Sequence, residues 1–431
     1  MTKRNSSLPT WYQDVSMPRF PKLTASSETD VVIIGGGLTG VLSAYLLAKK
    51  GKRVVLLEKR TMGSGATGYT TGFLTQSIDT NLADLLWMLG QEKAKLVTNS
   101  HGEGVRLLEQ IVKDERIDCE FVRCDNVVFA EAGKENDAGA LAGELKAAVI
   151  LGLEASIEPA DRLPFPNVGS LRVMNQAKYH PLKFLAGLAI AAQKAGAVLY
   201  ENTEASSIET SPTGVTVHVG ALCIKAAWVF SASYQPFAQP VGLYLKKAMY
   251  VSYVLELKVP KGSLPEATYE DTDNPYHYFR TDSLDTHDRI IVGGEDHRLD
   301  VPLSRDKNFA LLERYVEKTF PVLSYDIVTR WRGHVLEPID GLAFIGPYKD
   351  KRTWYAFGFS GNGMTYAPIA ATMFCDAVIG AHNPWREIYD VERIPGSKSL
   401  WIKGRDFSGE FVHGVLENMF ADSLKSKLKQ R

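Results

Sequence analysis

Residues 30–58 read DVVIIGGGLTGVLSAYLLAKKGKRVVLLE and decide the fold of this 431-residue chain. The stretch begins with a β-branched run, which is typical of a strand buried on both faces. Three glycines follow, and the pattern then predicts a helix from about Leu38 to Lys50 that ends at Gly51. Residues 52–57 return as a second buried strand. The stretch therefore predicts a βαβ unit with a right-handed crossover.

The glycines between the first strand and the helix fit the pattern G-x-G-x-x-G, at Gly35, Gly37 and Gly40. The first allows a tight turn, the second lets the backbone approach a pyrophosphate, and the third lets helix and strand pack closely. Glu58 ends the second strand, where its carboxylate can accept hydrogen bonds from ribose hydroxyls. The pattern indicates a dinucleotide site at the helix N-terminus. The alternative is a glycine-rich turn without a ligand.

Two more glycine-rich loops point to a flavin nucleotide. Residues 63–68 (GSGATG) directly follow the βαβ unit. Such a loop can reach the far phosphate and the ribityl chain of a flavin, and an NAD dehydrogenase does not require it. Residues 358–365 (GFSGNGMT) precede a predicted helix over 366–379, whose N-terminus can stabilise the charge that a flavin gains on reduction. The alternatives are a flexible connector and an ordinary helix cap.

The composition limits the classes of protein that are possible. Forty-nine Lys and Arg balance 50 Asp and Glu, which argues against a nucleic-acid binder. The length corresponds to two or three domains. No apolar run is long enough for a transmembrane segment, and no apolar stretch follows the N-terminus as in a signal peptide. Four Cys do not suggest a disulfide scaffold, so we expect a reducing, cytoplasmic location.

The rest of the chain predicts two interleaved domains. Pro181 opens a predicted helix that runs to about Ala195. Residues 247–258 and 276–294 alternate like antiparallel strands. Residues 354–393 read as a strand, a glycine-rich turn and a long helix. Further short strands are predicted over 197–200, 213–219 and 228–230. Nucleotide-binding pieces therefore lie at both ends, with β-rich and helical material between them.

Together these motifs resemble the FAD-dependent oxidoreductases of the D-amino-acid oxidase, glycine oxidase and sarcosine oxidase group. The likeness covers roughly residues 30–393, including residues 171–209 and 331–346. Arg280 and residues 291–297 look most like a branch often fused to a Rieske domain, and the Gly-Phe-Ser-Gly turn also resembles γ-glutamylputrescine oxidoreductase. The resemblance implies an FAD cofactor and hydride transfer from the C–N bond of an amine or amino acid to flavin N5. It also implies oxygen or a separate molecule as electron acceptor.

The resemblance further implies a fold class and a set of site residues. The class is α/β, with a Rossmann-like FAD-binding domain over residues 28–80, 170–235 and 335–393. An interleaved substrate domain with an antiparallel sheet takes residues 81–169 and 236–334, and a tail helix lies in 394–431. The candidate catalytic residues are Arg280, His297 and His334, and the alternative for each His is a structural role. The expected FAD-binding residues are Gly35, Gly37, Leu38, Thr39, Gly40, Glu58, Lys59, Gly65, Ala66, Thr67, Ala205, Gly346, Gly361, Asn362, Gly363 and Met364.

The sequence departs from the group in three ways. Residues 331–341 (WRGHVLEPIDG) place Val335 where the amino-acid oxidases have a carboxylate-binding Arg. Arg280, Arg332 or His334 could supply the cation instead. Arg280 is the preferred candidate, because residues 276–280 and 290–292 look like paired strands of the substrate sheet, whose alternate residues face one side. The alternative is that Arg280 simply pairs with a surface acid. No Cys follows Cys375, so the ligands of a Rieske centre are missing. The covalent subgroups attach flavin to Cys or His, where this sequence has Gly333 and Gly72, so we expect non-covalent FAD.

Other features support weaker hypotheses. Cys119 and Cys124 have the spacing of a flavin disulfide reductase pair, but two buried thiols are the simpler interpretation. The His residues form no cluster with zinc-ligand spacing, so no metal site is expected. Residues 411–428 predict a helix that could contact a membrane surface, a partner or the body of the protein. A different functional class also stays open, namely a flavin-binding electron-transfer or assembly subunit that has no small substrate.

Overall fold

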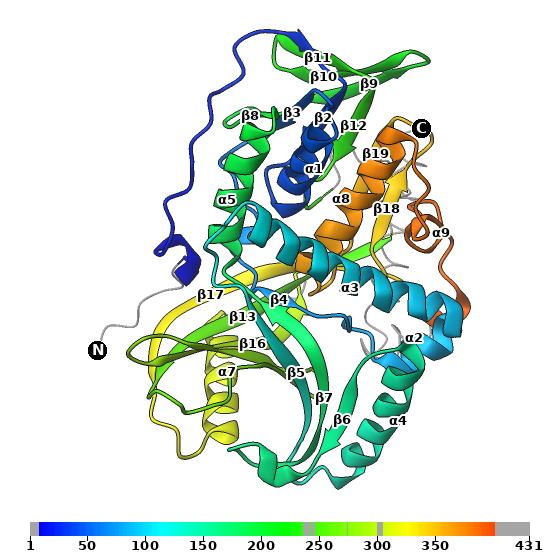
Figure 1. Cartoon of the computed structure of the whole chain (residues 1–431). Helices are drawn as coiled ribbons and strands as arrows, with labels where there is room; N and C mark the ends of the chain where they lie inside the picture. The colour runs from blue at the N-terminus through cyan, green and yellow to red at the C-terminus, as the bar shows by residue number, and fades with distance from the viewer. Residues whose placement is uncertain (1–7, 236–242, 244–245, 274, 300–304, 401–431) are drawn as a thin grey trace, which may run out of the picture. The chain divides into compact units, whose positions relative to one another are not determined.

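The computed structural model describes residues 8–235, 243, 246–273, 275–299 and 305–400 (Figure 1). The chain divides into two compact units, each built from three segments. We call the first the large-sheet unit; it comprises Met1–Met17, Ala66–Gly187 and Tyr250–His334. We call the second the parallel-sheet unit; it comprises Pro18–Gly65, Leu188–Met249 and Val335–Arg431.

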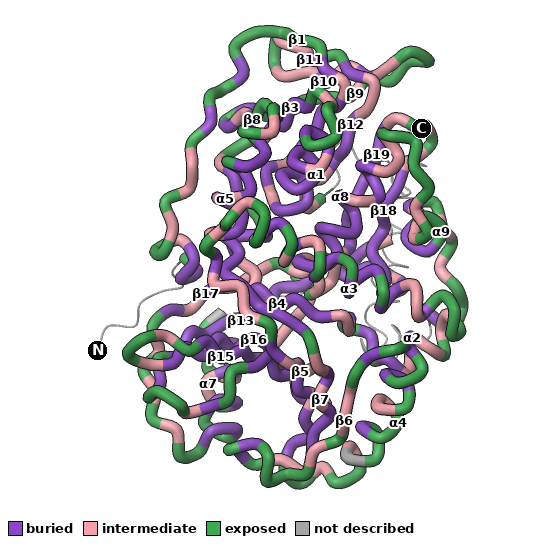
Figure 2. Tube along the Cα trace, viewed as in Figure 1, coloured by how far each residue is buried: buried purple, intermediate pink, exposed green. Residues whose placement is uncertain are grey.

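The parallel-sheet unit is built on a six-stranded sheet with the order β18-β19-β12-β2-β3-β8. All neighbours are parallel except β18 and β19. Every residue of β2 and β3 is buried, as Figure 2 shows in purple, which explains their uninterrupted apolar sequence. The strands are β2 (Val31–Ile34), β3 (Val54–Leu57), β8 (Val198–Tyr200), β12 (Trp228–Ser231), β18 (Phe344–Pro347) and β19 (Thr353–Phe357).

Helices α1 (Leu38–Lys49) and α8 (Gly363–Ile379) pack against each other in this unit (Figure 1). Helix α1 confirms the predicted βαβ connection. Helix α8 begins at Gly363 rather than at residue 366, because Asn362 takes the N-cap position. Short helix α9 (Arg386–Tyr389) packs against β18. A smaller sheet has the order β1-β11-β10-β9, with strands β1 (Ser27–Glu28), β9 (Ser207–Ser211), β10 (Gly214–Val219) and β11 (Leu222–Ala226).

The large-sheet unit contains a nine-stranded sheet with the order β17-β13-β16-β15-β14-β5-β7-β4, and β6 pairs with β7. The predicted antiparallel strands are confirmed, since β16 pairs with both β13 and β15. The strands are β4 (Phe73–Leu74), β5 (Val122–Glu131), β6 (Ala155–Glu158), β7 (Asn167–Lys178), β13 (Lys247–Val259), β14 (Thr268–Asp271), β15 (Tyr278–Ser283), β16 (Asp288–Arg298) and β17 (Asp326–Pro338).

Helices and aromatic side chains complete this unit. Helix α7 packs against β16, and α4 packs against β6 and β7. Phe129, Phe165 and Phe279 form an aromatic cluster in the core, with ring centroids 5.0–5.9 Å apart. The helices are α2 (Leu82–Leu89), α3 (Gln91–Asp114), α4 (Glu135–Leu151) and α7 (Arg305–Thr319), with 3₁₀ turns η1 (Thr10–Tyr12), η2 (Ala66–Gly68) and η3 (Ala160–Arg162). Helix α5 (Pro181–Lys194) is divided between the units.

The predicted α/β class is confirmed, while the units differ in detail from the expected domain boundaries. Residues 66–80 and 170–187 belong to the large-sheet unit, because β4 and β7 are strands of its sheet. The sequence pattern predicts them in the nucleotide-binding domain. The expected tail helix falls mainly on residues 401–431, which lie outside the described residues.

Candidate functional site

The turn between β2 and α1 leaves no room for side chains. Gly35 has a φ of +118°, and a Cβ on it would lie 2.7 Å from the carbonyl oxygen of Ala232. A Cβ on Gly36 would lie 2.8 Å from the Cβ of Glu58. A Cβ on Gly40 would overlap the carbonyl oxygen of Gly35, so this glycine allows α1 to approach the end of β2 closely.

The N-terminus of α1 is suited to an anion. Gly37 is the N-cap, no side chain caps the helix, and its first turn contains no acidic residue. Leu38 and Thr39 follow in the first turn and are both buried. The first turn of a helix carries N–H groups without intrahelical acceptors and a partial positive charge. These are the features that bind a phosphate group.

Glu58 lies at the end of β3, directly beside this turn. One carboxylate oxygen accepts a hydrogen bond from the backbone N–H of Gly36 at 2.7 Å, and the other accepts from the N–H of Arg60 at 2.8 Å. Each oxygen can accept a further hydrogen bond, which leaves capacity for a ribose hydroxyl. Lys59 points instead to the surface, where its ammonium lies 3.9 Å from Glu204 in an exposed pair.

A buried carboxylate that no sequence motif indicates follows β8. The carboxylate of Glu201 accepts hydrogen bonds from the N–H groups of Met62 at 2.7 Å and Phe20 at 3.3 Å. It therefore fixes the chain just after Glu58. Ala205 lies nearby in a hydrophobic cluster with the side chains of β2 and β3. No pattern around Glu201 distinguishes it from a surface acid, so only the fold reveals this role.

The loop of residues 63–68 is divided between the units. Gly63 has a φ of +74°, and its N–H donates to the carbonyl oxygen of Gly36 at 3.0 Å. This bond joins the second glycine-rich loop to the first within the parallel-sheet unit. Gly65 has open space around its Cβ position. Ala66 and Thr67 begin η2 in the large-sheet unit, and Thr67 is buried.

The third glycine-rich loop leads into α8. Ser360 has a φ of +50°, its N–H donates to the carbonyl oxygen of Leu336 at 3.2 Å, and its hydroxyl donates to Glu337. No acidic residue lies in the first turn of α8 and no side chain caps it, as for α1. The predicted residues here are Gly361, Asn362, Gly363 and Met364, with Gly346 (φ +154°) on β18.

Arg280, on β15 of the large-sheet unit, is almost completely buried, with 1% of its surface exposed. Its Nε donates to Asp282 at 2.9 Å, and its Nη1 donates to the carbonyl oxygens of Thr71 and Tyr179, each at 2.9 Å. Of the interpretations left open by the sequence, these contacts favour pairing with an acid. The acid is buried rather than at the surface, and the guanidinium is occupied by groups of the protein.

Arg332, His297 and His334 form a group in the same unit that we call the cationic cluster, after the charge of Arg332. Burial and the nearby positive charge of Arg332 lower the pKa of both His297 and His334. The ring of His297 stacks on that of Tyr253 at 5.7 Å, and Asn308 Nδ2 donates to His297 Nδ1 at 3.4 Å. Within the part of the chain that the structure describes, Arg332 has no carboxylate partner. His297 and His334 therefore lie close to Arg332, and both imidazoles are neutral at pH 7.

The family model described as "FAD dependent oxidoreductase" matches residues 30–377 of this chain. The chain belongs to this family. The cofactor is therefore FAD, as the glycine patterns indicated, and the protein is an FAD-dependent oxidoreductase.

Known relatives match most of the chain. The Bacillus subtilis (strain 168) protein YhfW, whose name describes a Rieske 2Fe-2S iron-sulfur protein, is 30% identical over 94% of this chain and 80% of its own length. Gamma-glutamylputrescine oxidoreductase of Escherichia coli (strain K12) is 27% identical over 89% of this chain and 92% of its own. The crystal structure of glycine oxidase from Geobacillus kaustophilus superposes with a TM-score of 0.71 and 24% identity, covering 86% of this chain and all of that one. The last comparison confirms the fold.

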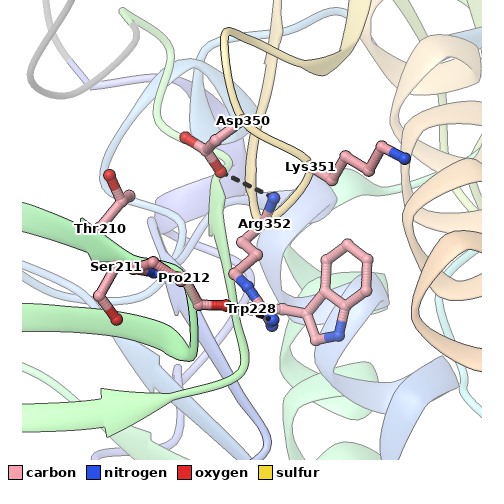
Figure 3. A pocket seen from close by; sticks show the side chains of 7 residues that line it. All are labelled: Thr210, Ser211, Pro212, Trp228, Asp350, Lys351 and Arg352. Carbon is pink, nitrogen blue, oxygen red and sulfur yellow. Dashed lines mark hydrogen bonds between the residues drawn. The ribbon is translucent and has the colours of Figure 1, made fainter.

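The parallel-sheet unit fits an FAD nucleotide on its own geometry. The cradle at Gly35 and Gly36 is one that a Cβ would fill, and the uncapped N-terminus of α1 opens beside it. Glu58 borders the same turn. A pocket of about 560 Å³ occurs elsewhere in this unit, at the amino ends of β12 and β19 (Figure 3). It lies at the opposite edge of the sheet from Gly35, which follows the carboxyl end of β2. We therefore do not assign the cofactor to it.

A pair of cysteines and a group of three acidic residues in the large-sheet unit have structural rather than catalytic surroundings. Burial raises the pKa of the Cys119 thiol to about 12 and that of Cys124 to about 11, and neither is in a disulfide. Both are therefore protonated and unreactive near neutral pH. Oxygen atoms of Glu131, Asp271 and Asp273 lie within 4.8 Å of one another. Neighbouring cations neutralise this acidic group, namely Lys134, Lys318 and His277.

No helix among the described residues is both long and apolar enough to cross a membrane.

Proposed function

We propose that this FAD-dependent oxidoreductase oxidises the C–N bond of an amine or amino acid. The observation that carries the proposal is the match over most of the chain to relatives named for such substrates, γ-glutamylputrescine and glycine. The cationic cluster around Arg332 supports it, because it offers a charged group in the large-sheet unit for an acidic substrate. The electrons would pass on to oxygen or to a separate acceptor.

The proposed cofactor site lies on the three glycine-rich loops and the ends of β3, β8 and β18. When bound, FAD accepts the hydride that leaves the carbon next to nitrogen, and water then hydrolyses the imine product. We infer that the first turns of α1 and α8 stabilise negative charge on the cofactor. Glu58 would accept from a ribose hydroxyl. The proposed residues are Gly35, Gly37, Leu38, Thr39, Gly40, Glu58, Lys59, Gly65, Ala66, Thr67, Ala205, Gly346, Gly361, Asn362, Gly363 and Met364.

Attachment of the cofactor is proposed to be non-covalent. Gly72 and Gly333 occupy the positions at which related enzymes attach flavin to a side chain. A Cβ on Gly72 would lie 2.6 Å from the carbonyl oxygen of Tyr179 and 2.8 Å from Arg280 Nη1. The space that an attachment residue would need at Gly72 is therefore filled by protein. Acid or heat should release all the FAD from purified protein.

We propose Arg332 as the group that recognises an acidic function of the substrate. Arg280 is already bound to Asp282 and to backbone carbonyl oxygens, so it has little capacity left. Arg332 has no carboxylate partner among the described residues. A charge-assisted hydrogen bond contributes about 1.5–3 kcal/mol, so Arg332→Met should raise KM for an acidic substrate at least about tenfold.

His297 and His334 are proposed to help keep the substrate nitrogen uncharged. Hydride transfer from the adjacent carbon requires an amine that has lost its proton. The positive charge that lowers the pKa of both imidazoles would also lower the pKa of an ammonium bound near them. A neutral imidazole can in addition accept the released proton at a ring nitrogen.

Anaerobic titration of the holoenzyme with a panel of amines and amino acids tests the proposed function. We expect at least one member to bleach the flavin absorbance at a saturating rate. Admission of oxygen, followed by measurement of hydrogen peroxide, then shows whether oxygen is the acceptor. A flavin that no panel member reduces, but that a protein redox partner does reduce, would instead identify an electron-transfer subunit.

A further inference from the structure

Helix α4 of the large-sheet unit has an exposed side that is unusually poor in charged residues. The helix packs on α2, β6 and β7, beside which Figure 1 shows it, and Leu141, Ala148 and Leu151 on its inner side are buried. We call its exposed side the α4 face. The members of this face are Glu135, Gly139, Ala142, Gly143, Lys146, Val149 and Ile150. A helix that faces only water normally presents polar side chains along this whole side.

The C-terminal end of the α4 face adjoins other exposed apolar side chains. Val149 and Ile150 are 63% and 41% exposed. Trp87 on α2 and Ile157 on β6 are 46% and 43% exposed, and both elements pack against α4. Large apolar side chains are therefore exposed on three adjoining elements of one unit. Such a concentration is typical of a surface that contacts another protein.

Packing within the chain does not require the two glycines of the α4 face. A Cβ on Gly139 or on Gly143 would meet no atom within 4 Å. Glycine destabilises the interior of a helix relative to alanine, so each position carries a cost without a benefit inside the unit. The two glycines lie four residues apart on the same side of α4, with Ala142 beside them. They leave a stretch of helix on which a second backbone can approach closely.

The two charges of the α4 face are complementary to each other. Glu135 lies in the first turn, and Lys146 follows eleven residues later, which is close to three full turns and places both on one side of the helix. Neither forms an ion pair within the described part of the chain. The glycines lie midway between them. An antiparallel copy of α4 that crosses at the glycines therefore sets each Lys146 opposite the Glu135 of the other copy.

This reciprocity identifies the occupant of the face. A symmetric interface uses the same surface on both subunits, so that every contact occurs twice. The α4 face meets this condition, because its small residues lie at the centre and its opposite charges lie at equal distances on either side. A parallel arrangement would instead place like charges side by side.

We propose that the α4 face is the centre of a symmetric dimer, in which α4 packs antiparallel on α4 of a second copy of this chain. Gly139 and Gly143 lie at the crossing, two Glu135–Lys146 pairs lie on either side of it, and the exposed apolar end of α4 becomes covered. The inference goes beyond the proposed function, because it concerns an assembly surface and not the reaction.

Sedimentation velocity of the FAD-loaded enzyme over a range of concentrations tests the dimer. We expect a species with twice the mass of one chain, which dissociates on dilution. Gly139→Leu fills the crossing but meets no atom of its own chain, so it should give a folded, FAD-containing monomer with a dimer Kd at least about 100-fold higher. Ala310→Leu is the matched control, because Ala310 is a small, exposed helical residue of the same unit on α7 and should leave the Kd unchanged.

A charge exchange tests the antiparallel arrangement. Lys146→Glu sets like charges opposite each other twice, so the dimer Kd should rise about tenfold at low salt. Adding Glu135→Lys to this variant restores opposite charges and should return the Kd to within about threefold of the wild-type value.

A wild-type enzyme that stays monomeric at every concentration would overturn the inference. A dimer with the same Kd in Gly139→Leu would do so too, because another surface would then hold the two copies together. A monomer whose α4 amides exchange slowly at every concentration would show that another part of the same chain covers the face, which also contradicts the proposal. Failure of the double charge variant to recover would exclude the antiparallel pairing.

Discussion

The β2–α1 turn and residues 69–72 between η2 and β4, which we call the clamped segment, are both loops, but they are held in opposite ways. The turn is held by its own backbone, because Gly35 donates to the carbonyl oxygen of Leu57 at 2.9 Å and Gly40 packs directly on Gly35. In the clamped segment, side chains of Trp331, Trp11 and Arg280 donate hydrogen bonds to its four backbone carbonyl oxygens at 2.7–3.3 Å. Local backbone contacts leave a recognisable spacing of glycines, whereas contacts between distant side chains leave no pattern. The β2–α1 turn can therefore be predicted from the sequence, whereas the clamped segment cannot.

The largest effect is expected from a substitution in the β2–α1 turn, the loop that is held by its own backbone. Gly40→Ala would place a Cβ on the carbonyl oxygen of Gly35, and neither atom can move without separating α1 from β2. We expect the purified variant to retain little or no FAD and to lose about 3 kcal/mol or more of stability. The FAD-to-protein absorbance ratio and urea unfolding measure the two effects.

Gly143→Ala is the matched control for this change. Gly143 is also a helical glycine, on α4, but a Cβ there meets no atom within 4 Å. Alanine has the higher helix propensity, so the control should keep its FAD and gain up to about 1 kcal/mol. Normal FAD content in Gly40→Ala would show that the close approach of α1 is not required for binding.

Much of the parallel-sheet unit could be predicted because its pattern is local. The β-branched runs gave β2 and β3, the glycines gave the turn, and the apolar stretch after Pro181 gave α5. The assignment of β4 and β7 to the large sheet could not be predicted, because strand pairing over more than 100 residues depends on tertiary packing. The start of α8 was also missed, because Gly and Met continue the helix toward Asn362.

The next largest effect is expected from removing the charge of Asp282, which pairs with the Arg280 that holds the clamped segment. Asp282 is buried, and although burial alone would raise its pKa, the charges of Arg280, Lys178 and Arg289 lower it overall. Asp282→Asn would leave these buried cations without their shared anion. Breaking a buried ion pair costs about 3–5 kcal/mol, and we expect a loss at the lower end of this range, measured by urea unfolding. Amide exchange of residues 69–72 should rise, while exchange in the β2–α1 turn should not. Equal acceleration of both loops would contradict the comparison.

A smaller effect tests whether charged side chains give the large-sheet unit a pH-dependent stability. Burial alone would lower the pKa of His277, but hydrogen bonds to Asp271 and Glu295 and their charges raise it to about 9. Because the folded-state pKa exceeds the unfolded value of about 6.5, the stabilisation is complete below pH 6.5. It should be lost as the pH rises toward 9, by about 2–3 kcal/mol. Unfolding curves between pH 6 and 9.5 should slope for the wild type and be flatter for His277→Gln. Identical slopes would assign the pH dependence to other groups.

The residues expected to bind the substrate could be predicted only in part from the sequence. The departure at Val335 could be read from the sequence, and it directed attention to Arg280, Arg332 and His334. The strand pattern favoured Arg280, but it could not show that this guanidinium is occupied, because whether an Arg has a partner depends on residues far away in the chain. Arg280 has Asp282 two residues along its own strand, but its other contacts are at Thr71 and Tyr179. Burial and pairing distinguish the occupied cation, Arg280, from Arg332, which has no carboxylate partner among the described residues.

The smallest expected effect is a change in the pKa of two His residues when the charge of Arg332 is removed. The positive charge of Arg332 is the second cause, after burial, of the lowered pKa of His297 and His334. Arg332→Met removes the charge and keeps much of the side-chain volume, so the pKa of both imidazoles should rise toward the ordinary value of about 6.5. Burial is unchanged, so the rise should be incomplete. NMR titration of the imidazole C–H signals measures both values in one experiment. Arg330→Met is the control, because Arg330 pairs with Glu313 at 2.6 Å and is absent from the causes of either pKa. If the two variants shift the imidazoles equally, Arg332 is not the group that sets their charge, and its assignment to the substrate site loses its electrostatic support.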